Sequence, residues 1–235
     1  MEMVLIKLYK KYIGYEGRKA ISQFFRLMHD CRIKKQIYFR MPKVASGTII
    51  RALDGETVIV PHSYKPKTIN NLLKVNSNAI KFTFVRHPLD RFISAYNWAL
   101  RDDINPVEYP LDIIQKEIIC KFEGINGFCE ALPTLLKSRS NHLIHFYPQA
   151  YYIKPHDELL VDYVGKYEAM MESCKVLQEE YGIPLSIEFG GNLKNKNKRI
   201  IKEPIKVLND MGVSTKNVKL LKEIYSKDFA TFEYY

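Results

Sequence analysis

Two short segments constrain the fold of this chain more than any other feature. The first runs from the apolar residues 37–39 into residues 41–48, and the second runs from residues 82–85 into residues 86–96. Each reads as a buried strand, a tight turn and a helix. The free N–H groups of a helix that follows a strand form a natural anion site. Two such corners in one chain indicate a ligand with two separated phosphate groups.

The rest of the chain continues the alternation of strands and helices, which favours a parallel sheet. Strands are predicted at residues 36–41, 56–62, 81–86 and 159–164. Helices are predicted from residue 47 to 53 and over 88–100, 111–138, 167–181, 203–211 and 214–232. We expect breaks in the third of these at Gly124, Gly127 and Pro133. The fold class is therefore α/β, a P-loop-like three-layer fold whose central parallel sheet is flanked by helices, with a helical C-terminal portion.

The size of the chain fits one domain. With 235 residues and 46% hydrophobic residues, it can fill one large core, so we expect a single domain over residues 1–235. Residues 1–35 alternate lysines and arginines with apolar residues, which predicts a basic amphipathic helical segment interrupted near Gly14 and Gly17. Such a segment packs on the domain or makes peripheral contact with a membrane.

Charge and cysteine content limit the possible ligands and the cellular compartment of the protein. The net charge of +10 suits a polyanionic ligand, an anionic sugar chain, a membrane surface or nucleic acid. The four cysteines show no CxxC spacing, which predicts buried reduced thiols. We find neither an apolar stretch of membrane-spanning length nor a signal peptide. These features favour a cytoplasmic protein, with peripheral contact at the inner face of the membrane as an extension of that expectation.

The first corner resembles a P-loop without being a Walker A motif, because its lysine precedes the small residues and does not stand directly before the hydroxyl residue. Lys43 lies at the end of the strand, where it can sit beside the bridging oxygen of a bound group. The residues whose N–H groups can wrap a terminal phosphate are Val44, Ala45, Ser46, Gly47 and Thr48. The hydroxyls of Ser46 and Thr48 add two donors.

The second corner supplies another set of phosphate donors. Arg86 ends an apolar strand, and Ser94 stands eight positions later in the helix that Pro88 begins. An arginine gives charge-assisted hydrogen bonds to phosphate, and a serine on the facing helix adds another. We expect Arg91 to pair with Asp90 or Asp103, unless it too serves the ligand. Tyr96, in the same helix, is expected in the core.

Five segments together resemble the carbohydrate sulfotransferases. Two match the nucleotide motifs of that family, Lys-Val-Ala-Ser at 43–46 and Val-Arg-x-Pro-x-x-Arg-x-x-Ser-x-Tyr at 85–96. The other three lie at 145–149, 162–168 and 224–234. The resemblance implies a bacterial-type enzyme that lacks the membrane anchor of Golgi relatives. Its donor would be 3′-phosphoadenosine 5′-phosphosulfate (PAPS), and its acceptor would be a hydroxyl of a polysaccharide, oligosaccharide or glycolipid.

The resemblance, which covers residues 36–235, also implies roles for individual residues. The Lys43 loop would bind the 5′-phosphosulfate, and Arg86 with Ser94 would bind the 3′-phosphate. Relatives usually carry threonine or serine where this chain has Gly47, which leaves the hydroxyl roles to Ser46 and Thr48.

In-line sulfuryl transfer needs a base for the acceptor hydroxyl and a cation on the leaving phosphate oxygen. Lys43 fits the second role, and the scheme requires no metal. We assign the base to His62, which ends the second strand at the ligand edge of the sheet. His145 is the alternative base. Glu168 is expected to pair with a nearby cation.

Two other function classes remain open on the sequence. A small P-loop kinase would depend on ATP–Mg, and a non-enzymatic nucleic-acid binder would show steep salt dependence. The first lacks the Walker lysine, and for the second we find no recognition motif, so we expect no nucleic-acid partner. The acceptor is expected to be a saccharide, with anionic and lipid-linked forms both open. Residues 194–198 include three lysines in a basic loop that is either a solvated surface loop or a contact for the nucleotide or an anionic acceptor.

Overall fold

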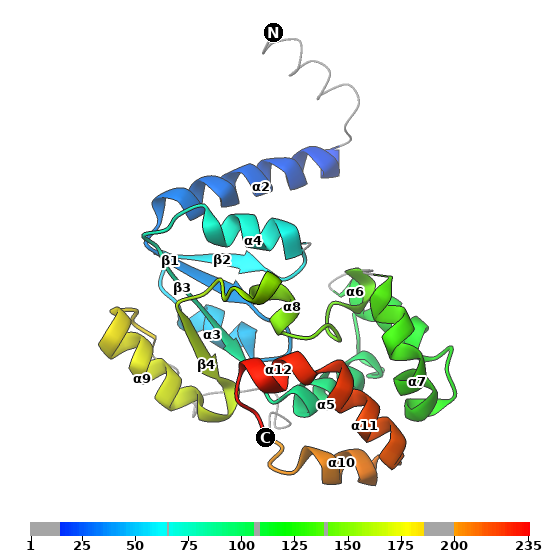
Figure 1. The fold of residues 1–235 in the computed structure, drawn as a ribbon. Coiled ribbons are helices and arrows are strands. Elements are labelled where there is room, and N and C mark those ends of the chain that lie inside the picture. Colours follow the sequence, from blue (N-terminus) through cyan, green and yellow to red (C-terminus); the bar gives the residue numbers. More distant parts are fainter. Residues whose placement is uncertain (1–14, 65, 106–108, 139–140, 186–199) are drawn as a thin grey trace.

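The computed structural model describes residues 15–64, 66–105, 109–138, 141–185 and 200–235. Its centre is a four-stranded parallel sheet with the strand order β2-β1-β3-β4 (Figure 1). The strands are β1 (Gln36–Arg40), β2 (Thr57–Pro61), β3 (Ile80–Val85) and β4 (Tyr163–Lys166). The expected α/β fold with a parallel sheet flanked by helices is therefore confirmed.

Alternating side chains on β1 pack against helices on both faces of the sheet, because successive residues of a strand point to opposite sides. Tyr38 stacks on Phe82 with ring centroids 5.3 Å apart. Phe39 points the other way and meets Tyr152 of α8 (Ala150–Ile153) at 5.8 Å. With both faces covered, the strands form a buried middle layer, as expected for a parallel sheet.

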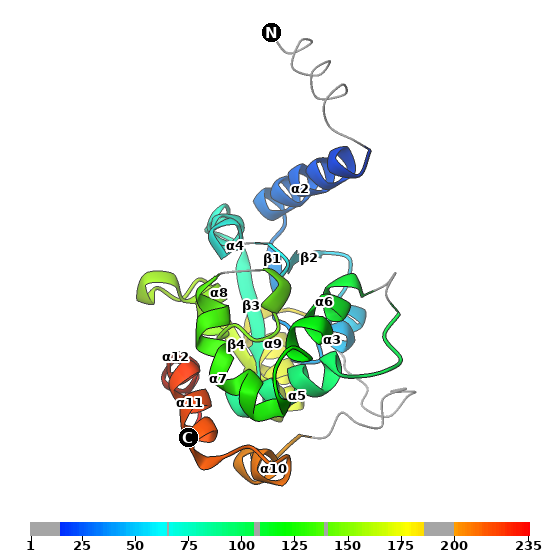
Figure 2. The same ribbon diagram turned by 90° about the vertical axis from the view of Figure 1, so that its right-hand side faces the viewer.

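The face that holds Tyr38 is covered by α9 (Met170–Tyr181), whose close approach depends on a glycine. A Cβ at Gly165 of β4 would lie 2.6 Å from the Phe84 ring and 3.0 Å from Ser173 of α9. On the opposite face, α8 packs against α4 (Pro66–Lys74). Figures 1 and 2 show α3 (Ser46–Ala52) on the side of α9.

The remaining helices gather beyond the carboxyl ends of the strands, as the two views show (Figures 1 and 2). They are α5 (Pro88–Ala99), α6 (Pro110–Ile119), α7 (Gly124–Lys137), α10 (Pro204–Asp210), α11 (Thr215–Ile224) and α12 (Ser226–Thr231). Three short 3₁₀ helices cover Asn141–Leu143, Pro155–Asp157 and Tyr167–Ala169. The long α2 (Tyr15–Ile33) packs on β2 and α4.

Several predicted boundaries are wrong. Helix α2 runs without a break through Gly17, while Gly14 lies outside the described residues. Gly127 and Pro133 lie inside α7, so the break falls before Gly124, which has φ +60°. None of the predicted helices covers α4 (Pro66–Lys74).

Two further corrections concern β4 and the C-terminal region. The last strand begins at Tyr163 rather than at residue 159. Just before it, the Lys81 N–H donates to the side-chain carboxylate of Asp162 (2.7 Å) and not to a backbone carbonyl, so regular strand pairing starts only after this residue. The predicted helix 214–232 is divided at Tyr225, whose buried hydroxyl donates to the Phe146 carbonyl (2.9 Å).

The four cysteines are free thiols, and three of them are buried as predicted. Cys120 is exposed, which corrects the expectation for that residue. No helix in the described part of the chain is long and apolar enough to cross a membrane.

Candidate functional site

The predicted site residues follow three neighbouring strands at one edge of the sheet. The Lys43 loop follows β1, His62 follows β2 and Arg86 follows β3. The chain passes from β1 out to β2 and then back across β1 to β3, so the loops after β1 and β3 flank a topological switch point. Ligands of open α/β sheets bind at such a crevice.

The Lys43 loop has an unusual backbone. Lys43 and Ala45 adopt φ values of +67° and +58°, in the left-handed region that residues with a side chain rarely enter. Each such residue costs about 1–2 kcal/mol. After the turn, the Thr48 N–H bonds to the Ala45 carbonyl (2.8 Å) and α3 begins at Ser46. The strained turn directs the chain from β1 into a helix start, the geometry of an anion-binding loop.

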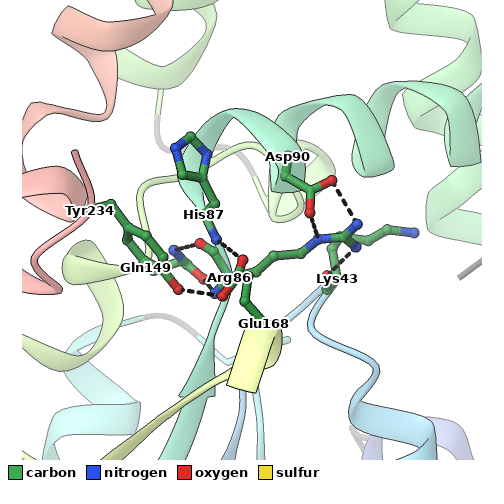
Figure 3. A network of polar contacts seen from close by, with 7 residues as sticks. All are labelled: Lys43, Arg86, His87, Asp90, Gln149, Glu168 and Tyr234. Carbon is green, nitrogen blue, oxygen red and sulfur yellow. Dashed lines mark hydrogen bonds and ion pairs between the residues drawn. The ribbon is translucent and has the colours of Figure 1, made fainter. Parts of the chain in front are cut away.

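Arg86 joins this loop to α5 (Figure 3). Its Nε and Nη2 donate to the two carboxylate oxygens of Asp90, each at 2.7 Å, and its Nη1 donates to the Lys43 carbonyl at 3.2 Å. The guanidinium carbon lies 4.5 Å from the centroid of the Tyr167 ring. Arg86 and Asp90 are both buried. Burial raises the pKa of Asp90, and the hydrogen bonds and charge of Arg86 oppose that effect.

The backbone of Arg86 is fixed from the other side by Gln149. The Gln149 amide accepts the Arg86 N–H (2.9 Å) and donates to the Arg86 carbonyl (2.8 Å), as a neighbouring strand would. Asp228 of α12 in turn accepts the N–H groups of Gln149 (2.8 Å) and Ala150 (2.7 Å). Arg86 is therefore held in place by residues that lie far away in the sequence.

A second network closes the same corner (Figure 3). Glu168 accepts the His87 N–H (2.6 Å) and the hydroxyl of Tyr234 (2.9 Å). The His87 ring packs edge-on against Phe229 and Tyr234. Among the described residues, the Glu168 carboxylate forms no ion pair with the cation we expected, and it anchors the C-terminal residues to the start of α5.

Ser94 lies in α5 between two residues that approach the Lys43 loop. It stands one turn after Asp90 and one turn before Trp98, and residues four apart share a face of a helix. Asp90 reaches the loop through Arg86, and the Trp98 ring lies 4.0 Å from the ammonium of Lys43. Ser94 is half-buried and, by this helix spacing, lies on the face of α5 that carries Asp90 and Trp98.

The Lys43 side chain turns away from Arg86 in Figure 3 and reaches the face of Trp98. Burial lowers the pKa of Lys43, and the nearby Arg101 acts in the same direction, whereas Asp112 opposes it. Within the described residues, no carboxylate forms an ion pair with this ammonium.

The two candidate bases, His62 and His145, are neighbours, with ring centroids 5.8 Å apart. The Nδ1 atom of His62 lies 3.2 Å from the Arg40 carbonyl, which only accepts hydrogen bonds. The proton of the neutral ring is therefore on Nδ1, and Nε2 keeps a free electron pair. Burial and then the charge of Arg40 lower the pKa of His62 to about 4, so the ring is neutral near pH 7.

His145 lies deeper in the same group. Its Nδ1 is 3.0 Å from Gln115 Oε1 and 3.5 Å from Asp112 Oδ1. Burial and the charge of Lys43 lower its pKa well below the ordinary value. Asp112 also accepts the indole N–H of Trp98 (2.6 Å) and so contacts both the histidine and the ring under Lys43.

Arg91 has a different role from the one expected. Asp90 pairs with Arg86, and Asp103 lies 3.5 Å from Arg101. The fully buried Arg91 instead donates to the carbonyls of His145 and Tyr147. Tyr96 is buried in the core, where it stacks on Phe92 with centroids 6.2 Å apart, as predicted.

The structure thus brings Lys43, His62, Arg86 and Ser94 to one edge of the sheet. Sequence reasoning missed Trp98, Asp112 and the role of Gln149. The only signal for Trp98 and Gln149 was their position beside the segment at 85–96 and in the segment at 145–149. Nothing in the sequence places Asp112 near a histidine. The basic residues 194–198 lie outside the described residues. The part of the chain that the structure describes contains no group of three or more His, Cys, Asp or Glu residues that could hold a metal ion.

A parallel α/β sheet with a strained, anion-binding type of loop after its first strand defines the P-loop-like class of α/β folds. The sulfotransferase family model matches residues 30–235, and the chain belongs to that family. Comparisons with curated proteins and with solved structures give no significant match. The protein is accordingly an enzyme of sulfuryl transfer, in an α/β fold of the expected class.

Proposed function

We propose that this sulfotransferase moves the sulfuryl group of PAPS to a hydroxyl of a saccharide. The observation that carries the proposal is the convergence of the Lys43 loop, the Arg86–Ser94 corner and His62 at one edge of the sheet. A donor with a 5′-phosphosulfate and a 3′-phosphate requires two anion sites, and this edge offers two.

The first anion site would hold the phosphosulfate. The N–H groups of Val44, Ala45, Ser46 and Gly47 would surround it at the turn after β1, and Thr48, whose N–H bonds to the Ala45 carbonyl, would contribute its hydroxyl. Lys43 would donate to the oxygen that bridges phosphorus and sulfur and stabilise the charge that develops there as the S–O bond breaks.

The second site would hold the 3′-phosphate. Arg86 shares its charge with Asp90, but the three hydrogen bonds of its guanidinium leave two of its five N–H donors for a ligand. The Ser94 hydroxyl would donate from the facing helix. Because part of the Arg86 charge is already neutralised, we assign Ser94 a measurable share of the 3′-phosphate recognition.

His62 would act as the base. Its Nε2 electron pair would accept the acceptor proton while the hydroxyl oxygen attacks sulfur opposite the leaving phosphate oxygen. The bound donor brings negative charge, which raises the pKa of a nearby histidine and makes this weakly basic ring a better base in the complex. His145, at 5.8 Å between ring centroids, is the alternative. The scheme uses no metal.

Titration calorimetry with adenosine 3′,5′-bisphosphate tests the donor class, with AMP and ATP–Mg as comparators. We expect a clear preference for the bisphosphate. Ser94→Ala should weaken bisphosphate binding at least about 10-fold, because a hydrogen bond to a charged group contributes about 1.5–3 kcal/mol, and should leave AMP binding unchanged.

Asn97→Ala provides the matched control, because Asn97 is exposed on the same helix. Arg86→Ala is a poorer test, since it would leave Asp90 buried without its partner. A preference for ATP–Mg, or equal binding of bisphosphate and AMP, would contradict the proposed donor.

The acceptor is proposed to be a saccharide, since the chain resembles enzymes that sulfate carbohydrates. A screen with PAPS and a panel of neutral, anionic and lipid-linked saccharides tests this part separately. Transfer to small phenols with none to saccharides would contradict the acceptor class while leaving the donor assignment intact.

A further inference from the structure

The Trp98 ring lies between two cations. Its centroid is 4.0 Å from the Lys43 ammonium and 3.4 Å from the Arg101 guanidinium carbon. A guanidinium stacked at that distance covers one face of the ring, so the ammonium must occupy the other. A cation held over an indole is attracted by the electron-rich face of the ring.

The indole is itself fixed at its edge. Its N–H donates to Asp112 Oδ2 at 2.6 Å, and Asp112 is 5% exposed. A short hydrogen bond to a buried carboxylate sets the rotation of the ring. The Arg101 N–H also bonds to the Trp98 carbonyl (3.4 Å), so the residue stacked on the ring is tied to the same helix end.

The Lys43 ammonium depends on this platform. Lys43 is half-buried, and in the part of the chain that the structure describes its ammonium makes no ion pair, although a charge removed from water without a partner is costly. The indole face and the more distant Asp112 carboxylate offset the cost of removing the Lys43 charge from water. A cation–π contact leaves the N–H donors on the far side of the ammonium free, whereas a direct ion pair would engage them.

We infer that Trp98 is a positioning residue for Lys43: its indole holds the ammonium in place for the donor, and Arg101 and Asp112 hold the indole. This inference rests on the proposed role of Lys43 at the bridging oxygen. The Asp112 carboxylate that fixes the indole also lies 3.5 Å from His145, the alternative base. It therefore connects the surroundings of Lys43 with the pair of histidines.

The geometry has a spectroscopic signature. Protons above an aromatic face resonate upfield, so the ε-CH₂ signal of Lys43 should lie upfield of the other lysines in a protein labelled with ¹³C-lysine. Lys43→Met assigns the signal by its loss. We expect the upfield shift to vanish in Trp98→Leu and to persist in Trp98→Phe, which keeps an aromatic face.

Tyr109→Leu is the matched control. Tyr109 contacts the Trp98 ring edge-on at 6.1 Å, whereas the cation–π contact of Lys43 is with Trp98. It should leave the Lys43 signal upfield. A Lys43 signal among the other lysines in the wild type, or one that Trp98→Leu does not move, would overturn the inference.

The function of the platform is tested by separating binding from reaction. Breakdown of PAPS to adenosine 3′,5′-bisphosphate in water needs no acceptor. We expect Trp98→Leu to slow it at least 10-fold while changing the dissociation constant of the bisphosphate less than 3-fold, and Trp98→Phe to restore most of the rate. Equal losses in both variants, or a loss of binding that matches the loss of rate, would contradict a positioning role.

Failure of this inference differs from failure of the proposed function. If the bisphosphate binds and the Lys43 signal is not shifted, only the platform is wrong. If the bisphosphate does not bind while the signal is shifted, the donor assignment is wrong and the positioning role falls with it.

Discussion

At the scale of single residues, the site combines strained and desolvated groups. Lys43 and Ala45 adopt left-handed backbone conformations, and the Lys43 ammonium and the His62 ring both have lowered pKa values because they are buried. Strain and desolvation of this kind concentrate at functional sites. In this chain both occur in the residues that follow the carboxyl ends of β1 and β2.

The base assignment predicts the effect of removing each histidine. His62→Ala should lower sulfuryl transfer from PAPS about 10²- to 10⁴-fold, the usual contribution of a general base. His145→Ala should cost less, since its ring contacts the base and not the acceptor. Steady-state rates with a saccharide from the acceptor screen measure both. If His145→Ala is the more damaging change, the two roles are reversed.

The pKa of His62 also predicts a pH dependence of stability. The ordinary pKa of 6.5 falls to about 4 in the folded protein, so the unfolded chain binds the proton more tightly. The stability that this neutral ring contributes is complete above about pH 6.5 and is lost as the pH falls toward 4. Urea unfolding at several pH values should show a shallower decline for His62→Gln than for the wild type. An equal decline would show that His62 is not buried as a neutral ring.

At the scale of elements, α2 is the helix whose role the sequence left most open. Its inner side contributes Cys31, Leu27 and Met28 to the core, while Phe25 and Ile33 are 63% and 59% exposed. Arg32 lies two turns after Phe25 and shares its face. Basic and apolar side chains on one exposed face suit a membrane surface.

We therefore propose that α2 makes peripheral contact with anionic membranes. The full chain should sediment with vesicles that contain anionic lipid and not with purely neutral ones, and Phe25→Ser with Ile33→Ser should reduce the bound fraction severalfold. Met171→Ser is the control, because Met171 is equally exposed, at 63%, on α9. Equal binding of the double variant and the control would contradict this role of α2.

At the scale of the whole molecule, the C-terminal helices complete the corner around Arg86. Asp228 of α12 is fully buried and binds the N–H groups at the start of α8, next to the Gln149 amide that holds Arg86. Tyr234 reaches the same corner through Glu168. The site therefore depends on elements from both ends of the matched region.

Removing the Asp228 carboxylate should destabilise the whole fold. Asp228→Ala leaves two buried N–H groups without their acceptor, so we expect the free energy of unfolding to fall by about 3 kcal/mol. Asp210→Ala, at an exposed position at the end of α10, should change it by less than about 0.5 kcal/mol. Urea unfolding of both variants measures the difference. A loss below about 1 kcal/mol for Asp228→Ala would mean that water replaces the carboxylate.

The sequence by itself determined the α/β class, the two strand–turn–helix corners and the family resemblance, because these depend on local patterns of apolar, small and cationic residues. It also located Lys43, His62, Arg86 and Ser94, since each stands at a fixed distance from a recognisable strand or helix. Only the tertiary structure showed that Arg86 is paired with Asp90, that Arg91 supports a loop and that Lys43 rests on Trp98. These contacts join residues on different elements or choose among several possible partners, and packing alone decides which side chains meet.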